Sequence, residues 1–247
     1  MSKPIGHTIH TFSSLESTNN YAMEQMRHNG MSHGEVVWAK HQAKGKGQRG
    51  NVWQSEKGKN LLFSICFMPS DLEIGHFFMF NQVVSVAIYH FLQSLGVKGL
   101  NIKWPNDILV NKHKIAGILT EFSTQNNTIN YAVVGIGLNV NQSGFKNLPN
   151  KVTSMANLLE KEFQLNKVLR PLLCCIEERW QLFNKSPESI KAEYVKSLYQ
   201  KDQWANYRVG SRFMEAKITG VCSQSGGLEV ECRHGISDLW LREVVYL

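Results

Sequence analysis

Residues 103–119 read KWPNDILVNKHKIAGIL, and this stretch predicts how part of a β-sheet is built. Pro105 favours an extended conformation at Trp104 and ends the ladder hydrogen bonding of the strand before it. Two apolar runs follow, at residues 108–110 and 114–122, with a short polar turn between them. Two such runs joined by a polar turn predict a β-hairpin.

Working outward, groups of strand-like segments are separated from groups of helix-like segments. Apolar runs bounded by turn residues predict strands at residues 7–12, 35–41, 60–68, 100–104 and 130–141. Periodicity and caps predict helices at residues 18–28, 76–95, 154–162 and 167–184, and one opening at Ser186-Pro187. Because helices and strands are segregated, we expect an α+β fold and not a doubly wound sheet. Short strands with glycine-rich turns follow, so residues 1–204 are predicted to form the larger domain and residues 205–247 a small all-β domain.

The composition excludes several classes of protein. With 43% hydrophobic residues the chain has enough apolar material for a large core, which excludes disorder and a disulfide-stabilised miniprotein. The net charge of +7 suits an anionic partner such as a nucleotide phosphate, nucleic acid or acidic protein. The five cysteines form no metal-binding spacing and no secretory signal is visible, so we expect a cytoplasmic protein without structural zinc. Between Glu73 and Lys98 no residue is charged, but polar residues at helical spacing predict a buried helix and no membrane span.

A glycine-rich basic loop spans residues 44–51. Its GKGQRG matches a dinucleotide-binding pattern, but a strand follows where that motif needs a helix, and neither a Walker A sequence nor kinase signatures are present. Glycines allow backbone amides to approach an anion, and Lys44, Lys46 and Arg49 add positive charge. A solvated hairpin tip or a nonspecific nucleic-acid patch explains the loop equally well.

Three further polar features have both structural and functional interpretations. Lys103 and Lys114 could converge beside Asp107 at the edge of the sheet and form a polar site. Alternatively, the segment around Asp107 only forms a turn, and the two lysines extend their ammonium groups to solvent. The glycines of GIGLN, residues 135–139, weaken a strand unless something lies against its backbone, the alternatives being a bulge or close helix packing. Ser17 predicts a helix N-cap, and that helix terminus could also offer amides to a ligand.

Five segments in this order resemble the biotin protein ligase family, the biotin–[acetyl-CoA-carboxylase] ligases. They are SLESTNNYA, QAKGKGQRGNVW, KWPNDILVNKHKIAGIL, VVGIGLNVN and VTSM. The resemblance implies a catalytic domain like those of class II aminoacyl-tRNA synthetases and lipoate ligases, with a mixed sheet flanked by helices, and a C-terminal SH3-like barrel. It also implies a reaction in two steps: biotin and ATP, with Mg²⁺, give biotinyl-5′-AMP, and a lysine of a biotin carboxyl carrier protein then takes the biotinyl group.

The resemblance also implies roles for individual residues. The expected biotin-binding residues are Ser17, Thr18, Asn19, Gln42, Lys46, Gly47, Gln48, Lys114 and Gly117. The expected ATP or adenylate residues are Arg49, Trp53, Lys103, Asn106, Asp107 and Asn139. Lys114, Lys103 and Lys46 are the expected catalytic cations, with Lys114 at the reacting carboxylate; the magnesium ligands are not assigned.

The sequence departs from this family in two places. Where bacterial relatives commonly have GRGRRGR, this chain has GKGQRGN, so Lys46 lacks bidentate geometry and Gln48 lacks charge. We expect adenylate retention and loop ordering to differ accordingly. The first motif begins near residue 14, which leaves no room for an N-terminal DNA-binding domain, so no operator binding is expected. Either a monomer or a homodimer is compatible with the sequence.

Three other functions remain open at this point. A lipoate or octanoate ligase would share the fold, although the arginine–glycine-rich motif followed by His-Asp that marks those enzymes is not found. A noncatalytic nucleic-acid-binding module could use the basic loop, and its affinity would fall steeply with salt. A degenerate ligase acting as a scaffold is disfavoured because Lys103, Lys114 and the WPND residues are retained.

Overall fold

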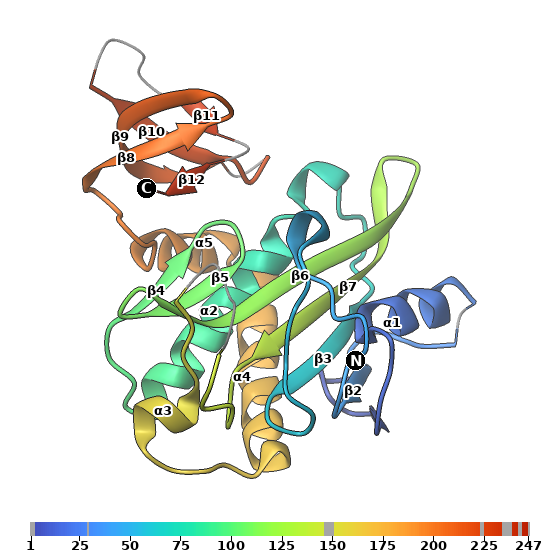
Figure 1. Cartoon of the computed structure of the whole chain (residues 1–247). Coiled ribbons are helices and arrows are strands. Elements are labelled where there is room, and N and C mark those ends of the chain that lie inside the picture. The colour runs from blue at the N-terminus through green and yellow to red at the C-terminus, as the bar shows by residue number, and fades with distance from the viewer. Residues whose placement is uncertain are drawn as a thin grey trace.

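The computed structural model describes residues 3–28, 30–145, 151–222, 225–233, 239–241 and 244–246. Within these residues, the larger part of the chain forms a seven-stranded mixed sheet of order β1-β2-β3-β7-β6-β5-β4 (Figure 1). β1 runs parallel to β2, and the other neighbouring pairs are antiparallel. The strands are β1 (Ile9–Phe12), β2 (Val36–Ala39), β3 (Leu61–Phe67), β4 (Leu100–Lys103), β5 (Asp107–Val110), β6 (His113–Gln125) and β7 (Thr128–Leu138).

Helices cover both faces of this sheet. They are α1 (Thr18–Arg27), α2 (Met79–Ser94), α3 (Met155–Leu159), α4 (Leu165–Lys185) and α5 (Pro187–Lys196), with short 3-10 turns η1 (Gln48–Gly50) and η2 (Ile74–His76). α2 and α4 cover the larger core on one face, and α1 covers a smaller core on the other. Val36 and Ile65 point into the larger core, whereas Val37 and Cys66 point toward α1, as strand alternation requires. The predicted α+β class is confirmed.

The β5–β6 hairpin predicted from residues 108–122 is present, and it contains a bulge. Ile108 pairs with Ala116 but Leu109 pairs with Lys114, so Ile115 is an extra residue in β6. Ile115 and Ala116 both lie in the larger core. Since two consecutive residues share one face, the bulge turns Lys114 to the α1 face of the sheet.

The KWPND stretch forms a second, tighter hairpin. Lys103 at the end of β4 pairs with Asp107 at the start of β5, and the Trp104–Pro105 peptide bond between them is cis. Pro105 therefore does end the strand pairing, as predicted. The chain reverses at once, so that β4 and β5 are neighbours.

The uncharged segment between Glu73 and Lys98 forms the buried helix α2. The helix begins at Met79, three residues later than predicted, because residues 74–76 form η2. Gln82 and Ser85 are buried in protein. No helix in the described part of the chain is long and apolar enough to span a bilayer.

A second, antiparallel sheet follows α5 and lies at one end of the molecule (Figure 1). Its described strands have the order β11-β10-β9-β8-β12. They are β8 (Trp204–Val209), β9 (Arg212–Val221), β10 (Leu228–Cys232), β11 (Leu239–Leu241) and β12 (Val245–Tyr246). The indole Nε1 of Trp104 donates to the carbonyl of Gly226 at 2.8 Å, which joins the two sheets. β8 begins beside the domain boundary predicted between residues 204 and 205, and that boundary stays a prediction.

Candidate active site

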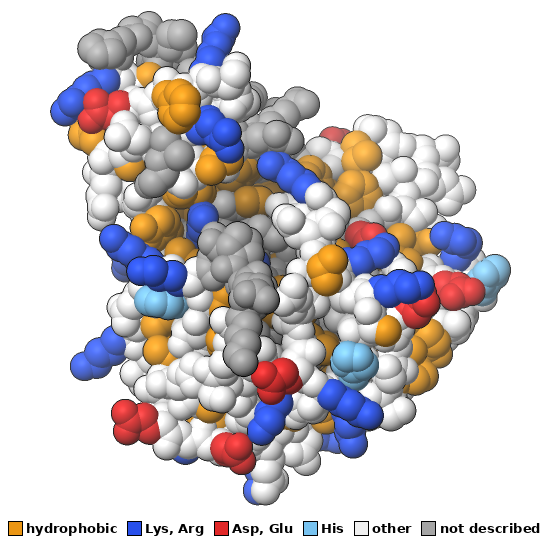
Figure 2. All heavy atoms as spheres, viewed as in Figure 1, with side chains coloured by type: hydrophobic (Ala, Val, Ile, Leu, Met, Phe, Trp, Pro, Cys, Tyr) orange, Lys and Arg blue, Asp and Glu red, His pale blue; other side chains and the backbone are white. Residues whose placement is uncertain are grey.

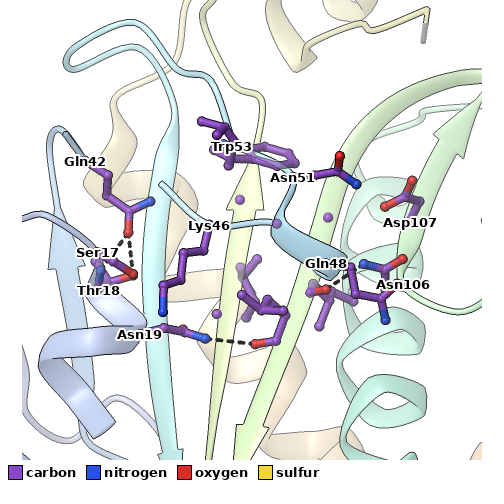
Figure 3. Close-up of a pocket in the computed structure, with 18 of the residues that line it drawn as sticks. Ser17, Thr18, Asn19, Gln42, Lys46, Gln48, Asn51, Trp53, Asn106 and Asp107 are labelled. Carbon is purple, nitrogen blue, oxygen red and sulfur yellow. Dashed lines mark hydrogen bonds between the residues drawn. The ribbon is translucent and has the colours of Figure 1, made fainter. Parts of the chain in front are cut away.

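A pocket lies on the α1 face of the large sheet, next to the first turn of α1 (Figure 3). Its walls come from α1, the glycine-rich loop, the KWPND hairpin, β6 and β7. The lining residues are Ser17, Thr18, Asn19, Gln42, Lys46, Gly47, Gln48, Asn51, Val52, Trp53, Asn106, Asp107, Lys114, Gly117, Ile118, Leu119, Gly135, Ile136 and Gly137. The fold thus brings together most of the residues singled out in the sequence; Arg49, Lys103 and Asn139 are not in this lining.

The glycine-rich loop is a hairpin folded over the pocket. Lys46 and Val52 form an antiparallel bridge, and Gly47 N–H donates to the carbonyl of Asn51 at 2.7 Å. Trp53 N–H donates to the carbonyl of Gly45 at 2.9 Å, which turns the chain back over the sheet. The loop is therefore a hairpin tip, as one interpretation proposed, and its inner side also lines the pocket.

Three strand glycines make room for side chains of the site. A Cβ on Gly137 would collide with the indole of Trp53, and one on Gly117 would lie 2.8 Å from the same indole. A Cβ on Gly135 would collide with the side-chain amide of Asn19. At Gly135 the alternative of close helix packing is correct, because Asn19 belongs to α1, whereas at Gly137 a side chain of the glycine-rich loop lies against the backbone. The approaching groups are Trp53 and Asn19.

One end of the pocket is polar but has a neutral hydrogen-bonding network. Gln42 Oε1 accepts from Thr18 N–H at 2.7 Å and from the Thr18 hydroxyl at 3.0 Å. The buried hydroxyl of Ser64 lies 2.7 Å from Thr18 Oγ1 and 2.6 Å from Asn19 Oδ1. Two hydroxyl protons serve these three side-chain contacts, because each hydroxyl donates once. One oxygen is therefore always left without a donor, and this end of the pocket suits a ligand that donates N–H.

Glu121 fixes the orientation of Asn19 beside this network. Asn19 Nδ2 donates to the carbonyl of Leu119 at 3.1 Å and to Glu121 Oε2 at 2.8 Å. A carboxylate only accepts, so the amide oxygen of Asn19 faces Ser64. Lys46 points toward Asn19 (Figure 3), and its ammonium lies 3.8 Å from Glu121 Oε1. Lys46 therefore belongs to this end of the pocket and is turned away from Asp107.

The opposite end of the pocket carries an ion pair. Lys114 Nζ lies 2.6 Å from Asp107 Oδ1, and both side chains are largely shielded from solvent. The same ammonium lies 5.3 Å from the centre of the Trp53 ring. Asn106 Nδ2 donates to the carbonyl of Ile118 at 2.9 Å, which ties the KWPND turn to β6. This end can place a cation beside an anionic group that enters the pocket.

Two of the three remaining predicted residues, Lys103 and Asn139, lie beside this charged end. Lys103 is paired with Asp107 across the hairpin; burial lowers the pKa of Lys103, Asp107 opposes that shift and Lys114 adds to it. Asn139 is buried and donates to the carbonyl of Thr153 at 3.1 Å, whose own N–H donates to the carbonyl of Lys114. Arg49 is exposed, with a φ of 56°.

The model of the Biotin/lipoate A/B protein ligase family matches residues 11–139, just over half of the chain. The chain belongs to this family. The bifunctional ligase/repressor BirA of Bacillus subtilis is 30% identical over 171 residues, which cover 68% of this chain and 52% of that protein. The biotin--[acetyl-CoA-carboxylase] ligase of Paracoccus denitrificans is 34% identical over 130 residues, which cover 51% of each. The chain spans about half the length of these relatives.

Solved structures of biotin protein ligases share the fold across nearly the whole chain. The enzyme from Aquifex aeolicus, in complex with biotin and ATP, has a TM-score of 0.80 at 24% identity and covers 97% of this chain and 98% of its own. The enzyme from Leishmania major, in complex with biotin, has a TM-score of 0.68 at 21% identity, covering 94% and 98%. These likenesses extend the shared fold of the ligase family to the C-terminal sheet.

The pocket offers few protein ligands for the Mg²⁺ that is expected for this ligase family. The described residues contain no group of three or more His, Cys, Asp or Glu side chains that could hold a metal ion. Asp107 is the carboxylate in the pocket lining. Magnesium in nucleotide sites is often held by one or two carboxylates together with substrate phosphates and water, so the donor set fits that mode.

Sequence reasoning did not find Ser64 and Glu121. Ser64 is a polar residue within the otherwise apolar, fully buried strand LLFSICF, and that break in pattern was the available signal. Glu121 had no comparable signal, because a glutamate near the end of a long strand is ordinarily solvated. In this member of the ligase family both act behind the residues that line the pocket.

Proposed function

We propose that this chain activates biotin with ATP to give biotinyl-5′-AMP and then transfers the biotinyl group to a lysine of a biotin carboxyl carrier protein. The observation that carries the proposal is a pocket with a neutral hydrogen-bonding network at one end and the Lys114–Asp107 ion pair at the other. Membership of the family and the names of the relatives support the choice of reaction.

The end of the pocket with the neutral hydrogen-bonding network suits the ring system of biotin, and the Lys46–Glu121 ion pair lies beside that network. The cyclic urea of biotin offers two N–H donors and one carbonyl acceptor. Thr18, Asn19 and Ser64 leave an oxygen short of a proton, and Gln42 holds its oxygen against Thr18 so that its amide nitrogen is free for a carbonyl. The dithiolane ring of lipoate has no N–H, so this end favours biotin over the family's other class of substrate.

The charged end suits the first reaction step. An oxygen of the biotin carboxylate attacks the α-phosphorus of ATP, the bond to the β-phosphate oxygen breaks, and pyrophosphate leaves. Both reactants are anionic, so a cation must lie where they meet. Lys114, oriented by Asp107 at 2.6 Å, supplies that charge without rearrangement. Magnesium, when bound, would neutralise the phosphates, and Asp107 is the carboxylate of the pocket lining that would hold it.

The second step needs the mixed anhydride to survive until the carrier arrives. The carrier lysine amine attacks the acyl carbon, an amide forms, and AMP leaves as the acyl–oxygen bond breaks. The hairpin of residues 44–53, with Trp53 over the strand glycines, shields the acyl group from water in the meantime. None of the five cysteines, all of which lie in the described part of the chain, forms a disulfide bond, which accords with a cytoplasmic location.

The nucleic-acid-binding alternative has less support. Figure 2 shows Lys and Arg side chains scattered over this face of the molecule, with Asp and Glu among them, and not gathered into one basic strip. The absence of operator binding and the oligomeric state stay predictions.

The proposal is tested by incubating the protein with ATP, Mg²⁺ and a carrier domain, with either biotin or lipoate, and measuring the intact mass of the carrier. A mass increase equal to one biotinyl group, dependent on ATP, is expected. An increase with lipoate and none with biotin would assign the other branch of the family, and no increase with either would refute ligase activity.

A further inference from the structure

The second sheet reaches the charged end of the pocket through Tyr246. The ammonium of Lys103 lies 4.8 Å from the centre of the Tyr246 ring, within the range of a cation–π interaction. Lys103 belongs to the large sheet and Tyr246 to strand β12 of the C-terminal sheet. A residue distant in sequence therefore stands beside one of the three cations predicted to serve the reaction.

Tyr246 is held firmly where it meets Lys103. Strand β12 pairs with β8, with Tyr246 opposite Tyr207. The Tyr246 ring packs against Tyr207 at 5.4 Å and against Tyr199 at 5.9 Å between ring centres. Tyr199 N–H donates to the carbonyl of Ile102, next to Lys103, at 2.8 Å. The ring position is thus fixed relative to β4 from two sides.

The phenol of Tyr246 contributes its ring and no hydrogen bond to Lys103. Its hydroxyl is buried without a hydrogen-bond partner among the described residues. Burial raises the pKa of Tyr246, with Tyr207, Tyr199 and Asp107 acting in the same direction, so the phenol stays neutral. The group that faces the ammonium is therefore the π-face of an uncharged ring.

The aromatic ring of Tyr246 affects the Lys103 ammonium differently from the way a carboxylate would. Lys103 is half-buried, and lost hydration disfavours its charged form. A second carboxylate would restore the charged form but would also cancel the field that an anionic nucleotide feels. The negative face of the Tyr246 ring stabilises the ammonium and leaves its full positive charge available. The Asp107 carboxylate is already ion-paired with Lys114. A neutral ring beside Lys103 adds no further negative charge to this end of the pocket.

We propose that Tyr246 is a positioning residue for the ligase reaction: its ring holds the ammonium of Lys103 in place at the charged end of the pocket, so that a side chain of the C-terminal sheet supports the active site. This inference rests on the proposed function for its kinetic consequence. Its structural core, the contact between the Tyr246 ring and the Lys103 ammonium, can be measured without catalysis.

The kinetic experiment compares Tyr246→Leu with Tyr246→Phe in the full chain. Pyrophosphate release is measured while ATP and biotin are varied separately. Tyr246→Leu is expected to raise the KM for ATP roughly 3- to 30-fold and to leave the KM for biotin within about 2-fold. Tyr246→Phe keeps the ring and is expected to stay near wild type. In a Lys103→Met background, Tyr246→Leu should cause no further loss, because the residue it positions is gone.

A matched control comes from the same sheet. The ring of Trp204 lies 5.4 Å from the Lys217 ammonium and 5.3 Å from the Arg233 guanidinium, so Trp204→Leu removes contacts of the same type that do not involve Lys103 and should leave both KM values unchanged. Equal losses for Tyr246→Leu and Tyr246→Phe, additive losses in the Lys103→Met background, or a wild-type KM for ATP in Tyr246→Leu would each overturn the proposal.

The second measurement separates this inference from the proposed function. Lysine side chains carrying ¹³C at Cε are observed by NMR at one fixed pH, with Lys103→Met identifying the Lys103 signal. Because the ammonium lies over the Tyr246 ring, the ring should shift the neighbouring Hε signals of Lys103 upfield; Tyr246→Leu is expected to remove this shift and Tyr246→Phe to keep it. If the signals move as expected but the wild type releases no pyrophosphate with biotin, the proposed function fails and the positioning role stands. If the signals do not move in Tyr246→Leu, the positioning role fails whatever the activity.

Discussion

Lys114 and Gly117 face the same pocket although they lie three residues apart in one strand. A Cβ on Gly117 would come within 3.1 Å of Lys114 Nζ. In a regular strand, residues an odd number apart point to opposite faces. The bulge at Ile115 removes this conflict, because it places one extra residue on the core side of β6. Lys114 thereby reaches Asp107 on the pocket side at 2.6 Å.

Replacement of this lysine tests its charge. Lys114→Met is expected to lower biotin-dependent pyrophosphate release by about 100-fold or more, because one well-placed electrostatic contact in such a site is typically worth roughly 3 kcal/mol. The exposed Lys98 provides the control: Lys98→Met should keep wild-type rates. Near wild-type release by Lys114→Met, in a variant with normal thermal unfolding, would refute the assigned role.

Gly117 tests the packing of the loop over the sheet. Gly117→Ala places a methyl group 2.8 Å from the Trp53 indole, and overpacking of this kind costs about 1–3 kcal/mol. The folded-over loop should be destabilised, so biotin and adenylate should bind about 10-fold more weakly, measured by titration of tryptophan fluorescence. Gly144→Ala meets no atom within 4 Å and should bind normally.

Replacement of Ser64 tests the role of its hydroxyl group in the hydrogen-bonding network with Thr18 and Asn19. Ser64→Ala removes the contacts to Thr18 Oγ1 and Asn19 Oδ1, so the Asn19 oxygen loses its hydroxyl donor although Glu121 still holds the amide. The KM for biotin should rise about 10-fold and the KM for ATP should not change, by steady-state pyrophosphate release. Equal effects on both substrates would point to general damage of the fold. Ser70→Ala, at an exposed serine, is the control.

Gln48 tests the departure of the loop from the sequence common in bacterial relatives. Gln48 lines the pocket, so an arginine there would add positive charge beside an anionic adenylate. Gln48→Arg is expected to slow release of biotinyl-5′-AMP several-fold, measured by chasing bound adenylate with excess unlabelled ligand. An unchanged release rate would remove the idea that this position controls adenylate retention.

The lowered pKa of Lys103 predicts that activity falls at alkaline pH. Its pKa is lower in the folded protein than in the unfolded chain, so Lys103 loses its proton at a lower pH than an ordinary lysine. The KM for ATP should therefore rise as the pH increases through the folded-state pKa of Lys103. Lys103→Arg stays charged throughout, so the rise should move to higher pH in a profile of kcat/KM for ATP. Identical profiles for the two proteins would exclude Lys103 as the titrating group.

The local pattern of apolar and turn residues was sufficient to predict many elements of the fold. Apolar runs broken by Pro105 and a polar turn predicted the β5–β6 hairpin, and the uncharged segment after Glu73 predicted the buried helix α2. The same pattern predicts the start of α2 three residues early, because the 3-10 turn at residues 74–76 continues the apolar run. Gly135 and Gly137 signalled a close approach, although the sequence could not say that Asn19 and Trp53 are the approaching groups.

The sequence by itself determined the order of the elements, the α+β class and the chemical types gathered at the site, because those follow from hydrophobic period and from residues close together in the chain. Only the tertiary structure decided which way Lys114 points, that Ser64 and Glu121 stand behind Thr18 and Asn19, and that Tyr246 meets Lys103. These relationships depend on the register of strand pairs and on the packing of one sheet against another. Both are set by contacts between distant segments, and a local pattern carries no record of them.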